Sequence, residues 1–204
     1  TNGIKGISRA MMRLTKLEQF FIANSPITAD EFFFDIPESS PYYAEQDEWS
    51  WSNFEFLMDV EIYNCRDLER LPLDMLTEVP KMQSLNVAMN YSISAEQLKS
   101  DWEAIIDGES GDEIQILYLS FNNLKETPSH DYMKRMAKMS YLDCTSNQIE
   151  VVHALGKEIS PASVLLDYNK IHTITLGEDG SFCGLSMLET FSCWNHCLTK
   201  LPDH

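Results

Sequence analysis

One spacing of apolar residues recurs along the chain and restricts its fold more than any other feature. It is clearest in Ile114, Leu117, Leu119, Asn122 and Leu124. Leu117 and Leu119 alternate as they would on a short strand with both side chains on its buried face. Asn122 follows where the chain must turn away from the strand. We expect its side-chain amide to bind backbone groups that this turn leaves without partners, including carbonyls of a neighbouring coil.

The same pattern recurs six more times. Its polar position is occupied in turn by Ser25, Cys65, Asn90, Asn122, Asn147, Asn169 and His196. Successive spacings of 40, 25, 32, 25, 22 and 27 residues stay near the period of such repeats, apart from two that contain insertions. The pattern predicts a single elongated solenoid over residues 1–204, with about seven coils. Because the chain starts and ends within a repeat, we expect it to be a fragment of a longer array without polar end caps.

Three parts of the chain carry a resemblance to a known family. They are Ile7–Leu17, Val60–Cys65 with Leu68–Pro72, and Ile114–Pro128. They resemble bacterial leucine-rich-repeat proteins of the Bacteroidetes surface type. The resemblance implies an α/β horseshoe with a parallel sheet on its concave face and mixed helical and irregular segments on its convex side. It also implies an exported, extracellular or cell-surface protein whose repeats mediate interactions, whose biochemical role is largely unassigned, and for which no catalytic residue can be named.

The two insertions cover residues 28–50 and 93–112. The first holds seven Asp or Glu and six aromatic residues but no Lys or Arg. Two interpretations stay open: its aromatic side chains pack back on the solenoid, or the segment is a binding loop. The carboxylates lack the regular spacing of a calcium loop.

Apolar residues at helical spacing predict two convex segments. One covers residues 4–17, where Met11 and Leu14 are three positions apart. The other lies in the 93–112 insertion and begins with Ser94-Ala-Glu-Gln97, which has the spacing of a capping box. Apolar residues at helical intervals follow it, so we expect a helix of about three turns.

Charge narrows the choice of partner. The chain has 32 acidic and 15 basic residues, a formal charge of −17. This excess disfavours nucleic acid, whose phosphates need a positive surface, and it disfavours anionic membranes. Cationic partners and divalent ions are compatible with it. No apolar run approaches the length of about 18 residues that a transmembrane helix requires.

The five cysteines do not suggest a disulfide framework, because their number is odd and three of them occupy positions of the repeat. Cys65 takes the polar position, while Cys144 and Cys193 take inward strand positions, so we expect buried free thiols. A zinc site of Cys183, Cys193, His196 and Cys197 is the alternative. Its ligands would not converge, because Cys193 should point inward and His196 fills the polar position. We therefore expect neither metal nor cofactor.

Strand alternation also identifies the side chains on the concave face. The candidate binding residues there are Phe21, Glu61, Tyr63, Tyr118, Tyr141, Asp143, Asp167 and Trp194. Aromatic rings beside carboxylates favour recognition of a protein or peptide, because Tyr and Trp bury a large area at small entropic cost. A carbohydrate-binding module is the alternative, with rings stacked on sugars and Asp and Asn bound to hydroxyls.

A catalytic role is the third possibility. Asp143 and Asp167 should lie on adjacent strands, with their backbones roughly 8 Å apart. Inverting glycosidases hold their two carboxyl groups about 6.5–9.5 Å apart. However, a groove open to water offers no pocket that would raise the pKa of one of them. We therefore expect a binding protein and not an enzyme.

Overall fold

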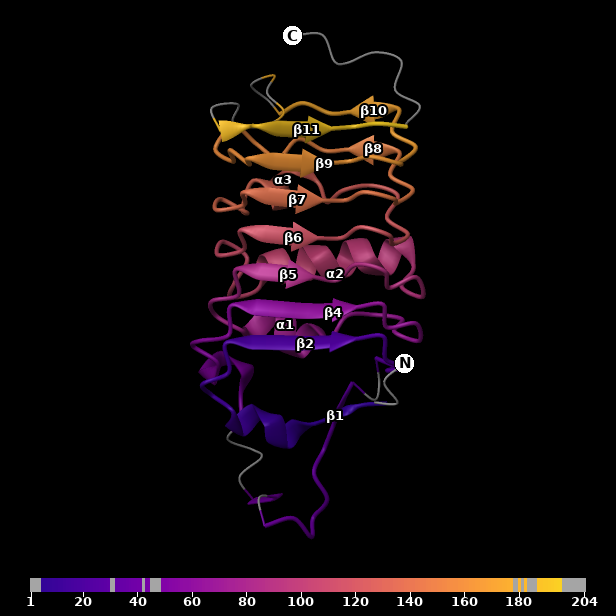
Figure 1. The fold of residues 1–204 in the computed structure, drawn as a ribbon. Helices are drawn as coiled ribbons and strands as arrows, with labels where there is room; N and C mark the ends of the chain where they lie inside the picture. Colours follow the sequence, from indigo (N-terminus) through magenta and orange to yellow (C-terminus); the bar gives the residue numbers. More distant parts are fainter. Residues whose placement is uncertain are drawn as a thin grey trace.

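The computed structural model describes residues 5–29, 32–41, 43–44, 49–177, 180, 182 and 187–195. They form a stack of coils whose strands build one seven-stranded parallel sheet (Figure 1). The strands are β2 (Gln19–Ala23), β4 (Asp59–Tyr63), β5 (Ser84–Asn86), β6 (Ile116–Tyr118), β7 (Tyr141–Asp143), β9 (Ser163–Leu165) and β11 (Thr190–Ser192). They lie in the order of the chain, so each coil packs on the next and the predicted solenoid is confirmed.

The predicted register of the strands is also confirmed. Leu85 of β5 pairs with Leu117 of β6, which pairs with Leu142 of β7. Each of these three side chains is only 1% exposed. A shift of one residue would move all of them to the other face of the sheet, so burial holds the coils in this alignment.

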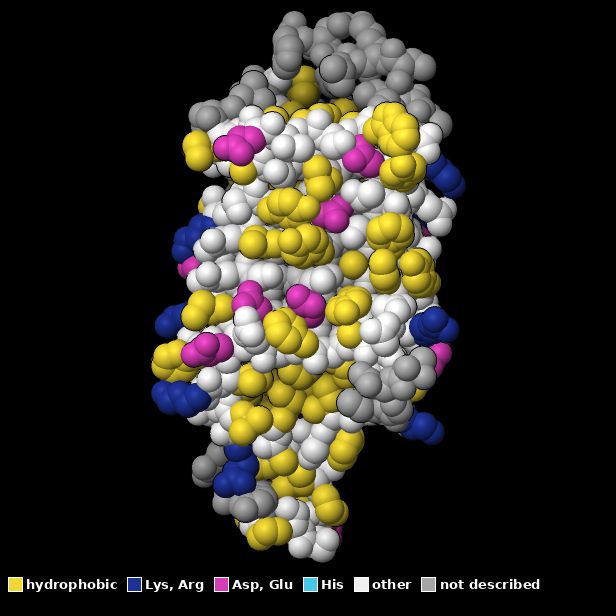
Figure 2. Space-filling view, in the orientation of Figure 1, with side chains coloured by type: hydrophobic (Ala, Val, Ile, Leu, Met, Phe, Trp, Pro, Cys, Tyr) yellow, Lys and Arg dark blue, Asp and Glu magenta, His cyan; other side chains and the backbone are white. Residues whose placement is uncertain are grey.

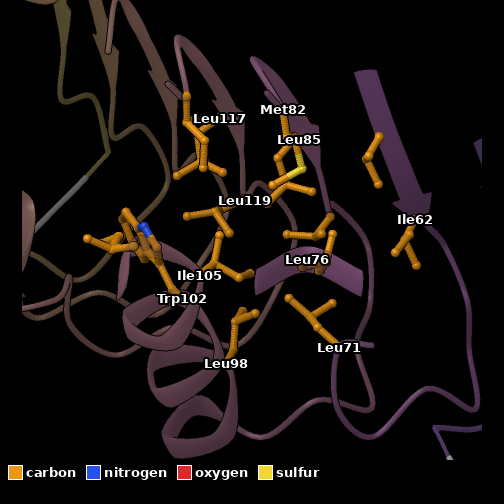
Figure 3. Close-up of a cluster of buried hydrophobic side chains, with 14 of the residues drawn as sticks. Ile62, Leu71, Leu76, Met82, Leu85, Leu98, Trp102, Ile105, Leu117 and Leu119 are labelled. Atoms are coloured by element: carbon orange, nitrogen blue, oxygen red, sulfur yellow. The ribbon is translucent and has the colours of Figure 1, made fainter. Parts of the chain in front are cut away.

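Three helices lie behind the sheet in Figure 1. They are α1 (Leu73–Glu78), α2 (Ala95–Asp107) and α3 (His130–Met133). Helix α2 begins as predicted, with Ser94 Oγ accepting a hydrogen bond from the backbone N–H of Gln97 at 3.1 Å. Its Leu98, Trp102 and Ile105 are buried and point toward the inward leucines of the strands (Figure 3).

The core is therefore a layer between the sheet and the helices, extended along the stack. Its side chains come from every coil, and no single centre exists.

The convex return after β7 is more regular than predicted. The resemblance implied helical and irregular segments on the convex side, but this return starts with strand β8 (Val151–Val152), which pairs in parallel with β10 (Thr173–Ile174). Coils of similar length bring equivalent backbone groups side by side after the turn. Pairing across coils satisfies those groups better than isolated loops would.

The first coil departs further from the prediction. Residues Arg9–Arg13 form a 3₁₀ helix, η1, in which Met12 is buried, while Leu14 is 55% exposed. The expected inward position of Leu14 is therefore wrong. A 3₁₀ helix repeats every three residues instead of 3.6, and η1 ends at Leu14. Strand β1 (Ile7–Ser8) precedes it and pairs with β3 (Phe33–Phe34) of the first insertion, a contact that no local spacing reveals.

Phe32 and Phe33 of the first insertion pack on the solenoid, whereas Phe34 and Tyr43 are exposed. Ring centroids are 4.8 Å apart between Phe32 and Phe33, 4.7 Å between Phe33 and Trp51, and 5.0 Å between Trp51 and Phe54. Phe32 and Phe54 are buried. A continuous line of rings thus joins the insertion to the core, which agrees with the first of the two interpretations for Phe32 and Phe33. Five of the insertion's seven acidic residues, Asp30, Glu31, Glu45, Asp47 and Glu48, lie outside the described residues.

The asparagines of the polar position tie successive coils together as expected. Asn122 Nδ2 donates to the carbonyls of Val87 in the preceding coil and Leu119 in its own, at 3.0 and 2.9 Å. Its Oδ1 accepts from the backbone N–H of Asn90 at 2.8 Å. Asn90, Asn147 and Asn169 make equivalent bonds, and all four are buried.

The residue before the polar position adopts a left-handed backbone conformation in every coil. These residues are Asn24, Asn64, Met89, Phe121, Ser146, Tyr168 and Asn195, with φ between 53° and 61°. The turn that ends each strand is therefore the same, whatever residue occupies it.

The cysteines confirm part of the prediction. Cys65 and Cys144 are free and fully buried, whereas Cys193 is free and half-buried. Burial raises the pKa of the Cys144 thiol far above its ordinary value. Cys193 directly follows β11, the last described strand of the sheet. Phe191 of this strand is 39% exposed.

Candidate binding face

The side of the sheet opposite the helices faces the viewer in Figures 1 and 2. We call it the open face; it is the predicted concave face. Among the described residues, no helix or strand covers it (Figure 1). Acidic and hydrophobic side chains are spread over it, while Lys and Arg lie along its two edges (Figure 2). The open-face positions of the seven strands contain no Lys or Arg.

Tyr118, Tyr141 and Asp143 form one cluster on this face. The two rings lie 5.2 Å apart between centroids. Tyr141 and Asp143 are two positions apart on β7, so their side chains are on the same side of the sheet. Partial burial raises the pKa of Tyr141, and the charge of Asp143 adds to the effect, so the phenol stays protonated and can donate a hydrogen bond. One oxygen of Asp143 accepts from the backbone N–H of Thr145 at 2.9 Å. Among the described residues, its other oxygen has no hydrogen-bond partner.

A second acidic group lies on β4. Asp59, Glu61 and Tyr63 alternate with buried residues and are half-buried on the open face. Asp59 accepts a bond from the side-chain amide of Gln19 at 3.0 Å. Glu61 pairs in register with Phe21 of β2, whose ring is 55% exposed. The structure thus brings Phe21, Glu61 and Tyr63 together, and strand β5 separates them from the Tyr118–Asp143 cluster.

Asp167 makes contacts that the sequence did not indicate. Both of its oxygens accept from the Ser192 hydroxyl at 2.7 Å, and one also accepts from the backbone N–H of Trp194 at 2.5 Å. Its carboxylate is therefore engaged by the next coil and holds β11 and Trp194 in place. This also leaves Asp143 and Asp167 unsuited to act as a pair of catalytic acids, because such a pair needs oxygens that can reach a substrate.

Trp194, one of the predicted binding residues, is 66% exposed. Three further exposed aromatic residues were not among the predicted binding residues. Tyr91, Phe121 and Tyr168 are 52%, 41% and 48% exposed, all near the carboxyl ends of strands. Tyr168 and Trp194 contact edge to face, with centroids 5.2 Å apart. The available signal was position: Phe121 and Tyr168 directly precede the asparagine, where the left-handed turn directs the side chain outward.

Other features of the described residues offer weaker sites. A cavity of about 380 Å³ lies between the first insertion and α1, lined by Arg9, Arg70 and Phe33 among others. Arg9 is already paired with Asp35 at 3.1 Å. No group of three or more His, Cys, Asp or Glu is close enough to hold a metal within the described part of the chain. Three members of the zinc alternative, Cys183, His196 and Cys197, fall outside it.

Among the helices of the described ranges, none combines the length and the apolar character that a membrane span requires.

No protein-family model matches the chain, and no curated protein matches it significantly. Its structure is similar to a leucine-rich-repeat protein from Bacteroides eggerthii, with a TM-score of 0.89 and 40% identity over 98% of this chain. The chain is a leucine-rich-repeat protein. A second leucine-rich-repeat protein, from Bacteroides thetaiotaomicron, is 39% identical over 94% of the chain, with a TM-score of 0.79. The leucine-rich-repeat chain spans 33% of the first of these proteins and 24% of the second.

Proposed function

We propose that this leucine-rich-repeat protein binds a protein or peptide through its open face. Repeats of this kind form a scaffold suited to interaction, and the open face is the surface that the scaffold leaves uncovered. The observation that carries the proposal is the composition of that face, which combines exposed or half-buried rings with carboxylates and has no Lys or Arg. Such rings contribute large contact areas at low entropic cost.

The shape of the face favours an elongated ligand. Seven parallel strands about 4.8 Å apart extend roughly 29 Å along the stack, whereas three residues of strand extend only about 10 Å across it. An extended segment of a partner can contact several coils along the longer direction. Whole-protein contacts of standard size would need more surface than this, about 800 Å² per partner.

Affinity capture from a mixture of bacterial and host surface proteins and glycans tests the proposal. The parent is compared with the folded variant Tyr63→Ala/Tyr118→Ala/Trp194→Ala, whose circular dichroism and thermal unfolding must match the parent. Phe34→Ala, which removes an exposed ring from β3 in the insertion, is the control. We expect the parent and the control to retain a protein or peptide that the triple variant loses.

Two results would contradict this proposal. Equal capture by the parent and the triple variant places the site elsewhere, and loss in Phe34→Ala places it in the first insertion. A captured glycan whose binding hardly changes with salt would support the carbohydrate alternative instead, because sugar stacking lacks the screening that weakens charge-steered binding.

We also propose that this binding takes place at the bacterial cell surface, the location that the family resemblance implies. Protease treatment of intact cells that produce the protein tests this. Cleavage of the protein under conditions that spare a cytoplasmic marker is the expected result, and full protection would contradict it.

A further inference from the structure

We propose that the segment bound by the open face is an extended peptide with two Lys or Arg side chains four positions apart. This inference rests on the proposed function of the open face and specifies its partner. It follows from which carboxylates on the face have free oxygens, from how far apart they lie, and from the rings beside them.

Three carboxylates of the open face have an oxygen available to a ligand: Asp59, Glu61 and Asp143. Asp59 accepts from Gln19 with its other oxygen, and it lies in register with Tyr141 instead of Asp143. Both oxygens of Asp167 are bound by Ser192 or Trp194. Asp143 has one oxygen bonded to Thr145 and the other without a partner among the described residues. Glu61, half-buried on β4, makes no hydrogen bond or ion pair with any described residue. No Lys or Arg of the open-face positions competes for either group, so both attract cationic side chains.

Glu61 and Asp143 lie in one line across the sheet. Glu61 pairs in register with Asn86, Asn86 with Tyr118, and Tyr118 with Asp143. Three strand-to-strand steps of about 4.8 Å separate them by about 14 Å. An extended chain rises about 3.4 Å per residue, so four residues cover the same distance. Because alternate side chains of an extended chain point to one side, residues i and i+4 both face the sheet.

Each of the two carboxylates has a tyrosine beside it on the same strand and the same face. Tyr63 lies two positions after Glu61, and Tyr141 lies two positions before Asp143. A cation that pairs with the carboxylate can therefore also contact a ring, an arrangement that favours Arg over Lys because the planar guanidinium stacks on aromatic faces. Tyr118 lies between the two subsites and contacts Tyr141, so it supports the backbone of the peptide in the middle of the line.

Two fluorescein-labelled peptides of nine residues test the spacing. Both consist of Ser and Thr with two Arg, at positions 3 and 7 in one and at positions 3 and 6 in the other. We expect the 3/7 peptide to bind the full chain about tenfold more tightly in fluorescence anisotropy at low salt, a difference of about 1.4 kcal/mol. In the 3/6 peptide the second Arg points away from the sheet and falls short of Asp143.

Charge-neutral variants test the two subsites. Glu61→Gln and Asp143→Asn should each weaken binding of the 3/7 peptide about tenfold and bring it near the affinity of the 3/6 peptide. Glu109→Gln removes the same charge from an exposed position after α2, on the other side of the sheet, and should leave the affinity unchanged. Equal affinity for both peptides, or equal losses in all three variants, would overturn the inference.

A displayed library of random 12-residue peptides separates this inference from the proposed function. The library is selected on the parent and then on the Tyr63→Ala/Tyr118→Ala/Trp194→Ala variant. Enrichment of Lys or Arg pairs at a separation of four, lost on the variant, supports both. Peptides that need the open face but lack this spacing overturn only the inference. Peptides that bind both proteins equally, or no enriched peptide, overturn both.

Discussion

The first two coils and the four that follow form the same turn by different means. In the first two, an asparagine adopts the left-handed conformation, at Asn24 and Asn64, and the next position holds Ser25 or Cys65. In the next four coils the asparagine stands one position later, in the buried polar position of the repeat, which we call the slot. The left-handed residues of these coils are Met89, Phe121, Ser146 and Tyr168.

The difference shows two ways of stabilising one backbone shape. Asparagine tolerates the left-handed region, and Asn64 Nδ2 also donates to Asn24 Oδ1 at 2.5 Å, so these two residues connect the first two coils directly. The side chains of Ser25 and Cys65 each donate to a carbonyl of their own strand. A bulky residue such as Phe121 is costly there, and the buried amide of the next residue offsets that cost by tying the turn to the preceding coil. The first two coils are also joined by five paired residues of β2 and β4, against three in each later pair of strands.

The comparison predicts the largest loss for removal of a slot asparagine. Asn122→Ala removes three buried hydrogen bonds and leaves the Asn90 N–H without a partner, whereas the carbonyls of Val87 and Leu119 keep their bonds to Asn90 and Asn147. The unpaired N–H costs about 1–3 kcal/mol and each lost bond to a carbonyl about 0.5–1.5 kcal/mol, so we expect the free energy of unfolding to fall by about 2–4 kcal/mol. Urea denaturation followed by circular dichroism measures it.

Two control variants separate the slot from asparagines in general. Asn123→Ala removes bonds to Tyr91 and Ile93 at a partly exposed site, and Ser25→Ala removes a single bond within one strand. Both should cost about 1 kcal/mol or less. A loss in either that equals the loss in Asn122→Ala would mean that the slot has no special role.

The second and third coils are also connected by a buried carboxylate, Asp101, whose effect on stability depends on pH. Asp101 of α2 is buried and accepts from the backbone N–H of Leu71 at 2.8 Å and from Gln97 Nε2 at 2.7 Å. Burial raises its pKa, although these bonds and the charge of Arg70 oppose the shift. A carboxyl group with a raised folded-state pKa gives its full stability below its unfolded pKa and loses it as pH rises through the folded pKa.

The Asp101→Asn variant lacks this titration but keeps an oxygen for Leu71. The variant should therefore gain stability relative to the parent between pH 4 and pH 7, by on the order of 1 kcal/mol. Urea denaturation at both pH values measures this gain, with Asp112→Asn at an exposed site as the control. A difference that stays constant or shrinks as pH rises would show that the buried charge costs nothing.

A smaller loss is expected when the left-handed asparagine of the second coil is removed. Asn64→Ala places a residue that tolerates φ of 53° less well in a turn without a slot amide of its own. We expect a loss of about 0.5–1 kcal/mol, measured as a shift of the urea midpoint. The same substitution at exposed Asn53, which lies in the 3₁₀ helix η3 (Trp51–Asn53), should have less effect.

The smallest effect is a gain. Phe121→Asn gives the fourth turn both stabilising features, namely a residue that tolerates the left-handed region and the buried amide of Asn122. Unfolding should become harder by about 0.5 kcal/mol, because the strain at Phe121 is relieved and little core packing is lost from a ring that is 41% exposed. Differential scanning calorimetry resolves the change. A lower melting temperature would mean that the exposed ring stabilises the turn instead of straining it.

Much of this architecture could be predicted from sequence because each coil combines two regular patterns, the alternation of buried and exposed residues on the strand and the asparagine that follows it. Alternation on the strand fixes which face Leu117 and Leu142 occupy, and the asparagine five positions later fixes where the strand stops. Together they determine register, which in turn places Glu61, Tyr118 and Asp143 in one line. The cap at Ser94 was equally local and was predicted for the same reason.

What could not be predicted depends on contacts between distant residues. Strand β1 pairs with β3, which lies in the insertion and is separated from β1 by more than twenty residues of sequence. Asp167 is engaged because Ser192 and the backbone of Trp194 approach it from the next coil, so its type and position alone suggested a free ligand. The assignment of the other open-face residues to binding is a prediction that the proposed experiments address.

The buried thiol of Cys144 allows local opening of the central coils to be measured by chemical modification. With its pKa raised by burial, this group has almost no thiolate while the stack is closed, so it reacts with an alkylating reagent only during local opening. Cys65, fully buried in the second coil, reports opening there, and burial raises the pKa of its thiol as well. Alkylation rates resolved by mass spectrometry for the two thiols therefore compare opening of the second coil with opening of the fifth. Unequal rates would show that these coils open separately.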